Sequence, residues 1–450
     1  MSQAIASLRR EFRPMLRLAV PLALAELGWM AMGIVDTIMA GRLGAAPLGA
    51  GSLGAMVFYP IVGSAIGLLL GMDTLVAQSF GARDTVDCRK TLVSGAWLAL
   101  LLSPPLAVTI LVVIPLLRTV GTNPNVMLHF VPYMRALLWG IPTLLLYGAF
   151  RRYLQAVNIV KPVMLALVSA NLVNILGNWI LMYGHWGARP MGLAGSGWST
   201  SISRAYMAAV LLAAILWHER ETGKLLFQIS WRPDWGRVRR LVSLGLPAAG
   251  QMMFEGAVFG LVTVIAARLD EASLAAHSIA VQVIATTYMV PLGISSAAAV
   301  RVGHAIGRKH PHDAAVAGWT ALAMSALFMG SAGILLWAAP SWLVRRFIDD
   351  PAVIRIGAVL LRIAALFELF DGFQVTATGA LRGVGDTRSP MLAHLAGYWV
   401  FGMPVAYVLC FPLRQGVTGI WVGLTIALIL IGVALIWVWS RASKMTTTNW

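Results

Sequence analysis

The sequence predicts an all-α integral membrane protein with twelve transmembrane helices in two six-helix bundles. The chain has 450 residues, of which 59% are hydrophobic and only 12% are charged. A soluble protein of this size carries about a quarter charged residues. The second observation is that the two halves of the chain repeat each other at a constant spacing. The net charge of +16 would suit nucleic-acid binding, but the basic residues lie between hydrophobic runs, so we expect no nucleic-acid partner.

Twelve apolar runs are long enough to cross about 30 Å of hydrocarbon, which takes roughly 20 helical residues. Short connectors with turn residues separate them. The longest connector, residues 218–240, divides the chain almost in half. We therefore expect an N-terminal six-helix lobe at residues 1–225 and a C-terminal six-helix lobe at residues 226–450. The predicted spans are 15–39, 48–78, 91–117, 128–150, 161–184, 191–217, 240–267, 276–300, 314–338, 352–380, 389–412 and 415–440.

The distribution of basic residues predicts the orientation of these spans. Of the 34 Lys and Arg residues, 23 lie on the side of the two termini, 8 lie on the opposite side and 3 lie within or at the edge of helices. Basic residues accumulate in cytoplasmic connectors. Both termini should therefore be cytoplasmic, and the even number of spans agrees with this orientation.

Residues 16–83 align with residues 242–309 at a constant offset of 226. Each half contains six spans, so both halves begin on the same side of the membrane, as parallel repeats about an axis normal to it. Two similar bundles that face each other form a cleft that can open to either side, which is typical of a transporter. The matching pairs are Pro21 with Pro247, Arg42-Leu43 with Arg268-Leu269, Leu48 with Leu274, Ser52 with Ser278, Gly67 with Gly293 and Gly81 with Gly307.

Five acidic residues fall deep within the predicted spans: Glu26, Asp36, Glu255, Glu368 and Asp371. An acid at the centre of a membrane helix costs roughly 2.5–3.5 kcal/mol on insertion scales, so such a residue usually has a function. A carboxyl group in a low-dielectric cavity can exchange a proton near neutral pH. A second carboxylate and neutral oxygens nearby can instead bind a hard cation such as Na⁺. The alternative is that each acid is a neutral, hydrogen-bonded core residue.

Two amides lie one helical turn apart in the span 161–184. Asn174 and Asn178 share one face of that helix. Intramembrane asparagines commonly join helices by hydrogen bonds, so a structural role and a place in a polar site are both open.

Four segments resemble a known family. Residues 33–41, the pair Phe254-Glu255, and residues 371–375 with 381–388 resemble the signatures of the multidrug and toxic compound extrusion (MATE) family. The resemblance covers essentially the whole chain and is closest to the NorM branch. It implies a twelve-helix, V-shaped antiporter that exports cationic amphiphilic drugs in exchange for Na⁺ or H⁺.

The resemblance also implies which residues form the sites. The matches to Glu255 and Asp371 form a cation site, with Na⁺ as one possible occupant, in the C-terminal lobe. The matches to Asp36, Asn174 and Asn178 form a polar site in the N-terminal lobe, with Thr200 as a further member. The pair Asp349-Asp350 matches acids near bound drug in some relatives, a solvated loop being the alternative.

One departure from the family pattern concerns the cation site. Many NorM-like proteins carry Tyr one turn before the acid that matches Asp371, and this chain has Phe367. Phenylalanine has no oxygen to ligate a cation, although Glu368 beside it could compensate. Phe367, Asp349 and Asp350 are our candidates for the substrate cavity, and the choice between Na⁺ and H⁺ is open.

Secondary active multidrug export is therefore the predicted function. The alternative is a flippase for lipid-linked oligosaccharides, as in the wider superfamily, but such flippases need a strongly cationic cavity. We find no metal-ligand spacing, nucleophile elbow or ATP-binding loop, so we expect neither an enzyme nor a cofactor. The two cysteines form no disulfide framework. The expected partners are organic cations, the coupling ion and lipid, for a monomer in a bacterial inner membrane.

Overall fold

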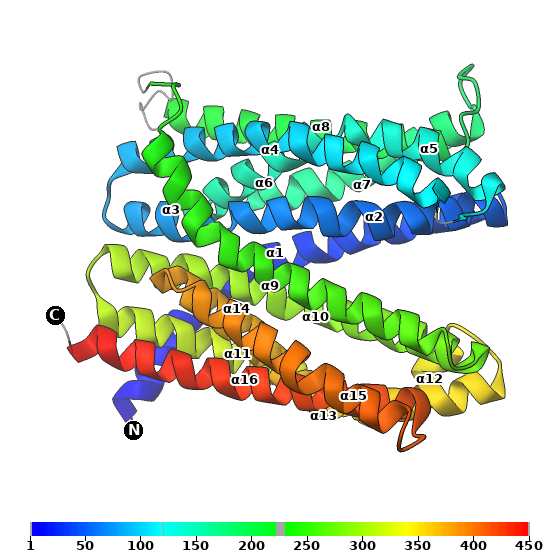
Figure 1. The fold of residues 1–450 in the computed structure, drawn as a ribbon. Coiled ribbons are helices and arrows are strands. Elements are labelled where there is room, and N and C mark those ends of the chain that lie inside the picture. Colours follow the sequence, from blue (N-terminus) through cyan, green and yellow to red (C-terminus); the bar gives the residue numbers. More distant parts are fainter. Residues whose placement is uncertain (1, 120, 222–229, 449–450) are drawn as a thin grey trace. The chain divides into compact units, whose positions relative to one another are not determined.

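The computed structural model describes residues 2–119, 121–221 and 230–448, which are almost entirely helical (Figure 1). No β-strand occurs in these ranges, so the all-helical prediction is confirmed for them. Packing divides the chain into two compact units. The N-terminal unit comprises Leu24–Ala249, and the C-terminal unit comprises Met1–Ala23 together with Gly250–Trp450.

Within the N-terminal unit, α7 packs most extensively against α8, α5 also packs against α8, and α4 packs against α6 (Figure 1). The buried side chains of these helices form one hydrophobic cluster, in which Phe58 and Phe130 are among the largest. The helices are α1 (Ser2–Gly41), α2 (Ala45–Leu69), α3 (Gly71–Gly81), α4 (Thr85–Thr119), α5 (Pro124–Leu138), α6 (Ile141–Ala156), α7 (Lys161–Tyr183), α8 (Leu193–Glu221) and α9 (Trp235–Ala266), of which α1 and α9 each continue into the C-terminal unit.

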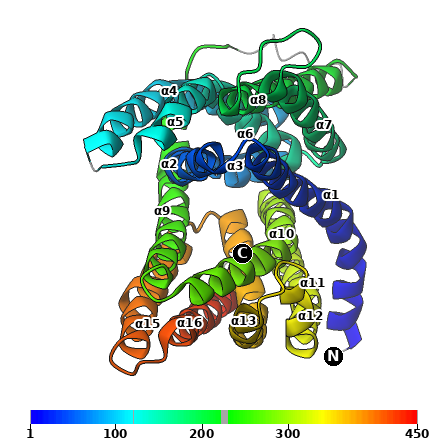
Figure 2. The ribbon, with the colours of Figure 1, turned by 90° about the vertical axis from the view of Figure 1, so that its right-hand side faces the viewer.

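Helix α13 is central to the packing of the C-terminal unit, where it contacts α10, α11, α12 and α16 (Figure 2). Trp421, Trp439 and Tyr398 are its largest fully buried side chains. The further elements are α10 (Glu271–Gly307), α11 (Pro311–Ala338), α12 (Pro340–Arg345), α13 (Pro351–Val384), α14 (Arg388–His394), a π-helical segment (Leu395–Gly402), α15 (Met403–Cys410) and α16 (Gly416–Thr448).

The described residues contain ten helical segments that are long and apolar enough to cross a membrane. Helices α5 and α6 together make an eleventh candidate, which bends by 47° where they meet. Helix α13 covers the predicted span 352–380 but is not among the candidates. Its charged and polar residues, including Arg362, Glu368 and Asp371, lower its hydropathy, and these are the residues that sequence analysis associates with function.

The sequence explains both ends of α13. Asp350 caps the first turn by accepting hydrogen bonds from the backbone N–H groups of Ala352 (2.7 Å) and Val353 (3.2 Å), and Pro351 occupies the first turn, where its missing N–H costs nothing. Gly385 ends the helix at a φ of 97°, a left-handed conformation that glycine adopts without strain. In between, Gly379 permits close packing on α10, because a Cβ there would collide with the carbonyl of Ser295.

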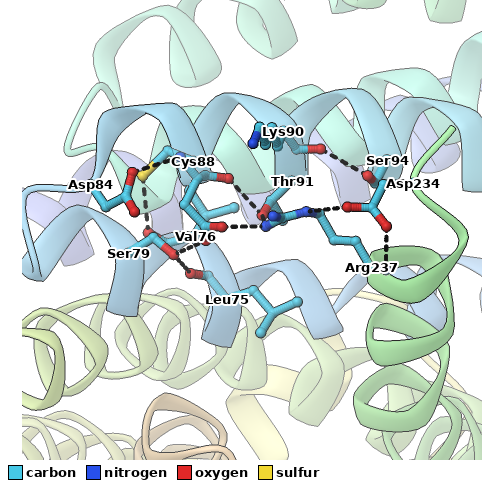
Figure 3. Close-up of polar contacts among 11 residues, drawn as sticks. Leu75, Val76, Ser79, Asp84, Cys88, Lys90, Thr91, Ser94, Asp234 and Arg237 are labelled. Carbon is cyan, nitrogen blue, oxygen red and sulfur yellow. Dashed lines mark hydrogen bonds and ion pairs between the residues drawn. The ribbon is translucent and has the colours of Figure 1, made fainter. Parts of the chain in front are cut away.

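The first turn of α9 and the residues just before it are bonded to α4 of the N-terminal unit (Figure 3). The Arg237 guanidinium forms an ion pair with Asp87 at 2.6 Å and donates to the Thr91 hydroxyl at 3.0 Å, both on α4. The Trp97 indole N–H donates to the carbonyl of Trp231 at 2.8 Å. These bonds explain why residues 230–249 pack with the N-terminal unit.

The compact units therefore differ from the predicted lobes 1–225 and 226–450. The predicted boundary itself lies at residues 222–229, outside the described residues. The observed boundaries fall within α1, after Ala23, and within α9, after Ala249. Each of these helices therefore belongs partly to one unit and partly to the other. No local sequence signal predicts this division.

Candidate functional site

Three carboxyl groups gather in the C-terminal unit. Glu255 lies on α9, and Glu368 and Asp371 lie three residues apart on α13. Asp371 interacts electrostatically with both of the other carboxyl groups. We call these three residues the acidic cluster. Glu368 is completely buried, Asp371 is 6% exposed and Glu255 is half-buried, so the cluster is open to its surroundings mainly at Glu255.

One amide joins the two helices that carry the acidic cluster. The fully buried Gln374 donates from its side-chain amide to Asp371 Oδ1 at 2.9 Å, and it lies close enough to Glu255 to affect that carboxyl group. The Thr287 hydroxyl, on α10, donates to Glu368 Oε1. Sequence reasoning assigned no role to Gln374 or Thr287. The signal available for Gln374 was its position one helical turn after Asp371 in an apolar stretch.

The acidic cluster has no basic partner among the described residues. Elsewhere in the protein, buried acids pair with arginines: Glu26 with Arg151, Asp73 with Arg152, and Glu219 with Arg89. Burying an unpaired carboxylate is costly unless a counter-charge or a proton neutralises it. The acidic cluster therefore needs protons or cations, whereas Glu26 is already neutralised by a structural ion pair.

A tyrosine hydroxyl lies near the acidic cluster. Tyr398 is in the π-helical segment Leu395–Gly402, is fully buried, and interacts electrostatically with Glu255 and Asp371. Its Oη atom has no hydrogen-bond partner in the described structure. Short π-helical segments occur frequently at functional sites, because they re-aim side chains. No sequence pattern in residues 389–412 predicts a π-helical segment, so Tyr398 was not among the predicted site residues.

Phe367 lies in the packed core of the C-terminal unit. Its side chain is 3% exposed, and its ring packs against Trp421 with 6.2 Å between the ring centroids. The structure thus places Phe367 in a hydrophobic contact rather than on an open surface of this unit, which gives its predicted place in the substrate cavity no support here.

The four residues predicted for the N-terminal site come together from three helices. Asp36 is on α1, Asn174 and Asn178 are on α7, and Thr200 is on α8. The Asn178 amide donates to Asp36 Oδ1 at 2.6 Å and to Asn174 Oδ1 at 3.2 Å. The Thr200 hydroxyl donates to Asp36 Oδ2 at 3.3 Å. We call these four residues the polar cluster.

The polar cluster combines an available oxygen with a nearby positive charge. The Oδ1 atom of Asn178 is buried and has no hydrogen-bond partner in the described structure. The buried Arg204 on α8 interacts electrostatically with Asp36 and lies 4.6 Å from the centroid of the Phe58 ring. Asp36 is therefore partly compensated by a fixed arginine, unlike the acidic cluster.

The two acids of the loop before α13 have different environments. Asp350 is the N-cap of α13. Asp349 lines a pocket of about 610 Å³ together with Arg345, Arg355 and Arg362. Three guanidinium groups outnumber one carboxylate, so the pocket has the wrong charge for an organic cation.

The carboxyl groups alone do not form a metal site. In the described ranges, no group of three or more His, Cys, Asp or Glu side chains could hold a metal ion. An ion bound between Glu255 and Asp371 would need neutral oxygens, and the candidates are the Gln374 amide and the Tyr398 hydroxyl. Oxygen ligands of this kind suit hard cations, and the same carboxyl groups suit protons.

A polytopic helical chain with buried acids that lack a basic partner among the described residues is typical of a membrane transporter. Its family is identified by a model of the MatE family, which matches residues 21–180 and 247–408. The chain belongs to this family. The two matched segments begin 226 residues apart, which confirms the internal repeat.

Several curated relatives match nearly the full chain. A probable multidrug resistance protein NorM of Mesorhizobium japonicum is 36% identical over 444 residues, covering 97% of this chain and 95% of the relative. The multidrug resistance protein PmpM of Pseudomonas aeruginosa is 33% identical over 430 residues, covering 94% and 89%. The predicted similarity to the NorM branch is confirmed.

Solved structures share the fold. A eukaryotic MATE transporter, AtDTX14, superposes with a TM-score of 0.87 at 19% identity, covering 98% of this chain and 99% of that chain. A transporter of the MOP superfamily from Pyrococcus furiosus has a TM-score of 0.88 at 19% identity, covering 98% and 97%. At these identities the likeness concerns the fold alone.

Proposed function

We propose that this protein exports cationic amphiphilic compounds across the bacterial inner membrane in exchange for inward Na⁺ or H⁺. The names of its NorM and PmpM relatives, which are multidrug resistance proteins, support drug export, and the acidic cluster supports a cationic substrate. In this proposal both termini are cytoplasmic, the protein is a monomer, and the ion-bound and ion-free forms open to opposite sides of the membrane.

The observation that carries the proposal is the acidic cluster without a basic partner. Glu255, Glu368 and Asp371 are close enough to repel one another when ionised. Protons, Na⁺ or an organic cation can relieve this repulsion, and no fixed arginine competes for it. A site that must be neutralised by a mobile cation is suited to coupling the movements of two cations in opposite directions.

The exchange follows from the limited negative charge of the two clusters. When a proton or Na⁺ binds Asp371 or Glu255, the acidic cluster loses the charge that would retain an organic cation, and the drug is released. When the ion leaves on the cytoplasmic side, the charge is restored and the next drug binds. The polar cluster provides a second place, at Asp36, where the same competition occurs.

The position of Phe367 favours protons over Na⁺ as the coupling ion. Phe367 contributes no oxygen and packs against Trp421, so any neutral oxygen ligand must come from other residues, such as Gln374 or Tyr398. A proton needs a single carboxyl oxygen, whereas Na⁺ needs several ligands at once. We therefore expect a proton gradient to drive export at least as well as a Na⁺ gradient.

Replacing Asp371 by Asn tests the proposal. Ethidium efflux from cells that express Asp371→Asn should fall roughly tenfold or more, because losing one charged ligand of a buried cation costs at least about 1.5 kcal/mol. The amount of protein in the membrane is measured in parallel. Glu271→Gln is the matched control, since Glu271 is an exposed acid in the first turn of α10, and its efflux should equal that of the wild type. Normal efflux by Asp371→Asn at equal abundance would refute the assigned role.

A further inference from the structure

The pocket between α12 and the first turns of α13 is a concentration of positive charge that drug export leaves unexplained. Arg345 ends α12, and Arg355 and Arg362 lie seven residues apart on α13. Residues seven apart share a helix face and are separated by about 10.5 Å along the axis. All three arginines are exposed and line the pocket of about 610 Å³.

The guanidinium groups of this pocket are available to a ligand. None of the three arginines forms a hydrogen bond or ion pair with another residue in the described part of the chain. Asp349 is the single acidic residue of the pocket lining. Neighbouring Arg346, by contrast, lies 4.7 Å from the centroid of the Trp342 ring and is not part of the lining.

The position of these arginines opposes the usual distribution of basic residues. Arg345 and Arg355 are on the side of the membrane that we predict to be periplasmic, where Lys and Arg are scarce. Arg362 lies about two turns further into the predicted span 352–380. Three arginines without a protein partner in the described part of the chain can together bind an anion.

The surroundings of the pocket favour a lipid as the source of that anion. Trp337, Trp342 and Phe347 are each more than half exposed, and exposed aromatic residues of membrane proteins gather at the level of the lipid headgroups. Apart from Ser341, the rest of the pocket lining is apolar and includes Ile354 and Val359. Arginines next to apolar side chains suit a phospholipid, in which a phosphate group is attached to acyl chains.

We propose that this pocket binds the phosphate group of an anionic phospholipid. Arg355 and Arg345 hold the phosphate oxygens, since guanidinium forks bind phosphate in a bidentate manner. Arg362 extends the positive surface toward the membrane interior, and the acyl chains lie along Ile354 and Val359. The site is separate from the acidic cluster and excludes organic cations by its charge.

Native mass spectrometry of the purified, delipidated protein tests this proposal. Phosphatidylglycerol and phosphatidylcholine are added separately at equal concentrations. The wild type should retain phosphatidylglycerol at least fivefold better than phosphatidylcholine, and the double variant Arg345→Gln/Arg355→Gln should lose this preference. Arg346→Gln is the matched control, which removes a neighbouring charge outside the pocket and should keep the preference.

Further arms separate the lipid from other anions and guard against misfolding. Inorganic phosphate at millimolar concentration should not displace phosphatidylglycerol, and displacement would assign the pocket to free phosphate instead. Arg355→Lys retains the charge but loses the planar guanidinium group, so it should lose part of the preference. This variant is the test if a thermal melt shows that the double variant is unfolded. Equal retention of both lipids by the wild type, or an unchanged preference in a folded double variant, would overturn the proposal.

Discussion

At the scale of single residues, the acidic cluster is organised by one amide that connects two helices. Gln374 donates to Asp371 and lies close to Glu255, so it connects α9 and α13 at the carboxyl groups that we expect to bind the coupling ion. In the proposed exchange, an ion that binds Asp371 competes with the hydrogen bond from this amide. The cluster can therefore transmit ion occupancy to the packing of both helices.

Tyr398 provides a residue-scale prediction. Its buried hydroxyl has no hydrogen-bond partner in the described structure, so Tyr398→Phe should not lower the thermal stability of the protein, and relief of an unsatisfied polar group could raise it. If the hydroxyl ligates the coupling ion, ion-driven ethidium export should fall about fivefold, which corresponds to about 1 kcal/mol. Export and melting temperature are measured on the same preparation. A lower melting temperature with unchanged export would identify the hydroxyl as structural.

The residues of the polar cluster were predictable, but their hydrogen bonds were not. The spacing of Asn174 and Asn178 placed them on one helix face, and family resemblance added Asp36 and Thr200. Contacts between α1, α7 and α8 depend on tertiary packing, which a single sequence does not encode locally. The same limit applies to Glu26, because its partner Arg151 is 125 residues away along the chain.

At the scale of elements, α13 is capped at both ends and carries polar residues in its interior. Asp350 and Pro351 begin it, Gly385 ends it, and its interior carries Glu368, Asp371 and Gln374. Packing against three long helices supports an element whose own hydropathy is low for a membrane span. The sequence predicted its existence and approximate bounds, 352–380, because the length of an apolar run is a local signal.

The cap of α13 provides an element-scale prediction. Asp350→Ala should destabilise the protein by about 1 kcal/mol, because two backbone N–H groups lose their acceptor. Drug selectivity should be unchanged, since this carboxylate is engaged by the helix. Thermal unfolding and a panel of cationic substrates check both parts. A changed substrate range at wild-type stability would instead support the sequence-based placement of Asp350 in the substrate cavity.

Other elements departed from sequence expectation for identifiable reasons. The predicted span 128–150 is divided into α5 and α6, with a bend of 47° between them. Pro142 in the first turn of α6 was a visible signal for a break. The π-helical segment Leu395–Gly402 had no comparable signal, because π-helical hydrogen bonding depends on packing rather than on a residue type.

At the scale of the whole molecule, the repeat and the unit boundaries agree. The boundaries after Ala23 and Ala249 are 226 residues apart, the same offset that aligns the two halves of the sequence and separates the two MatE matches. The sequence thus predicted the repeat. It did not predict that α1 and α9 each divide between units, because that exchange depends on contacts such as Arg237 with Asp87.

In the proposed function, a cation gradient drives export through the acidic cluster. Inside-out membrane vesicles without any other energy source receive either a pH gradient or a Na⁺ gradient. Ethidium accumulation is then measured for the wild type and for Asp371→Asn. We predict accumulation with the wild type under the pH gradient, at a level equal to or above that under the Na⁺ gradient, and none with Asp371→Asn. Accumulation that persists without any gradient, or that is unchanged in Asp371→Asn, would contradict the claim, and strict Na⁺ dependence would contradict the role given to Phe367.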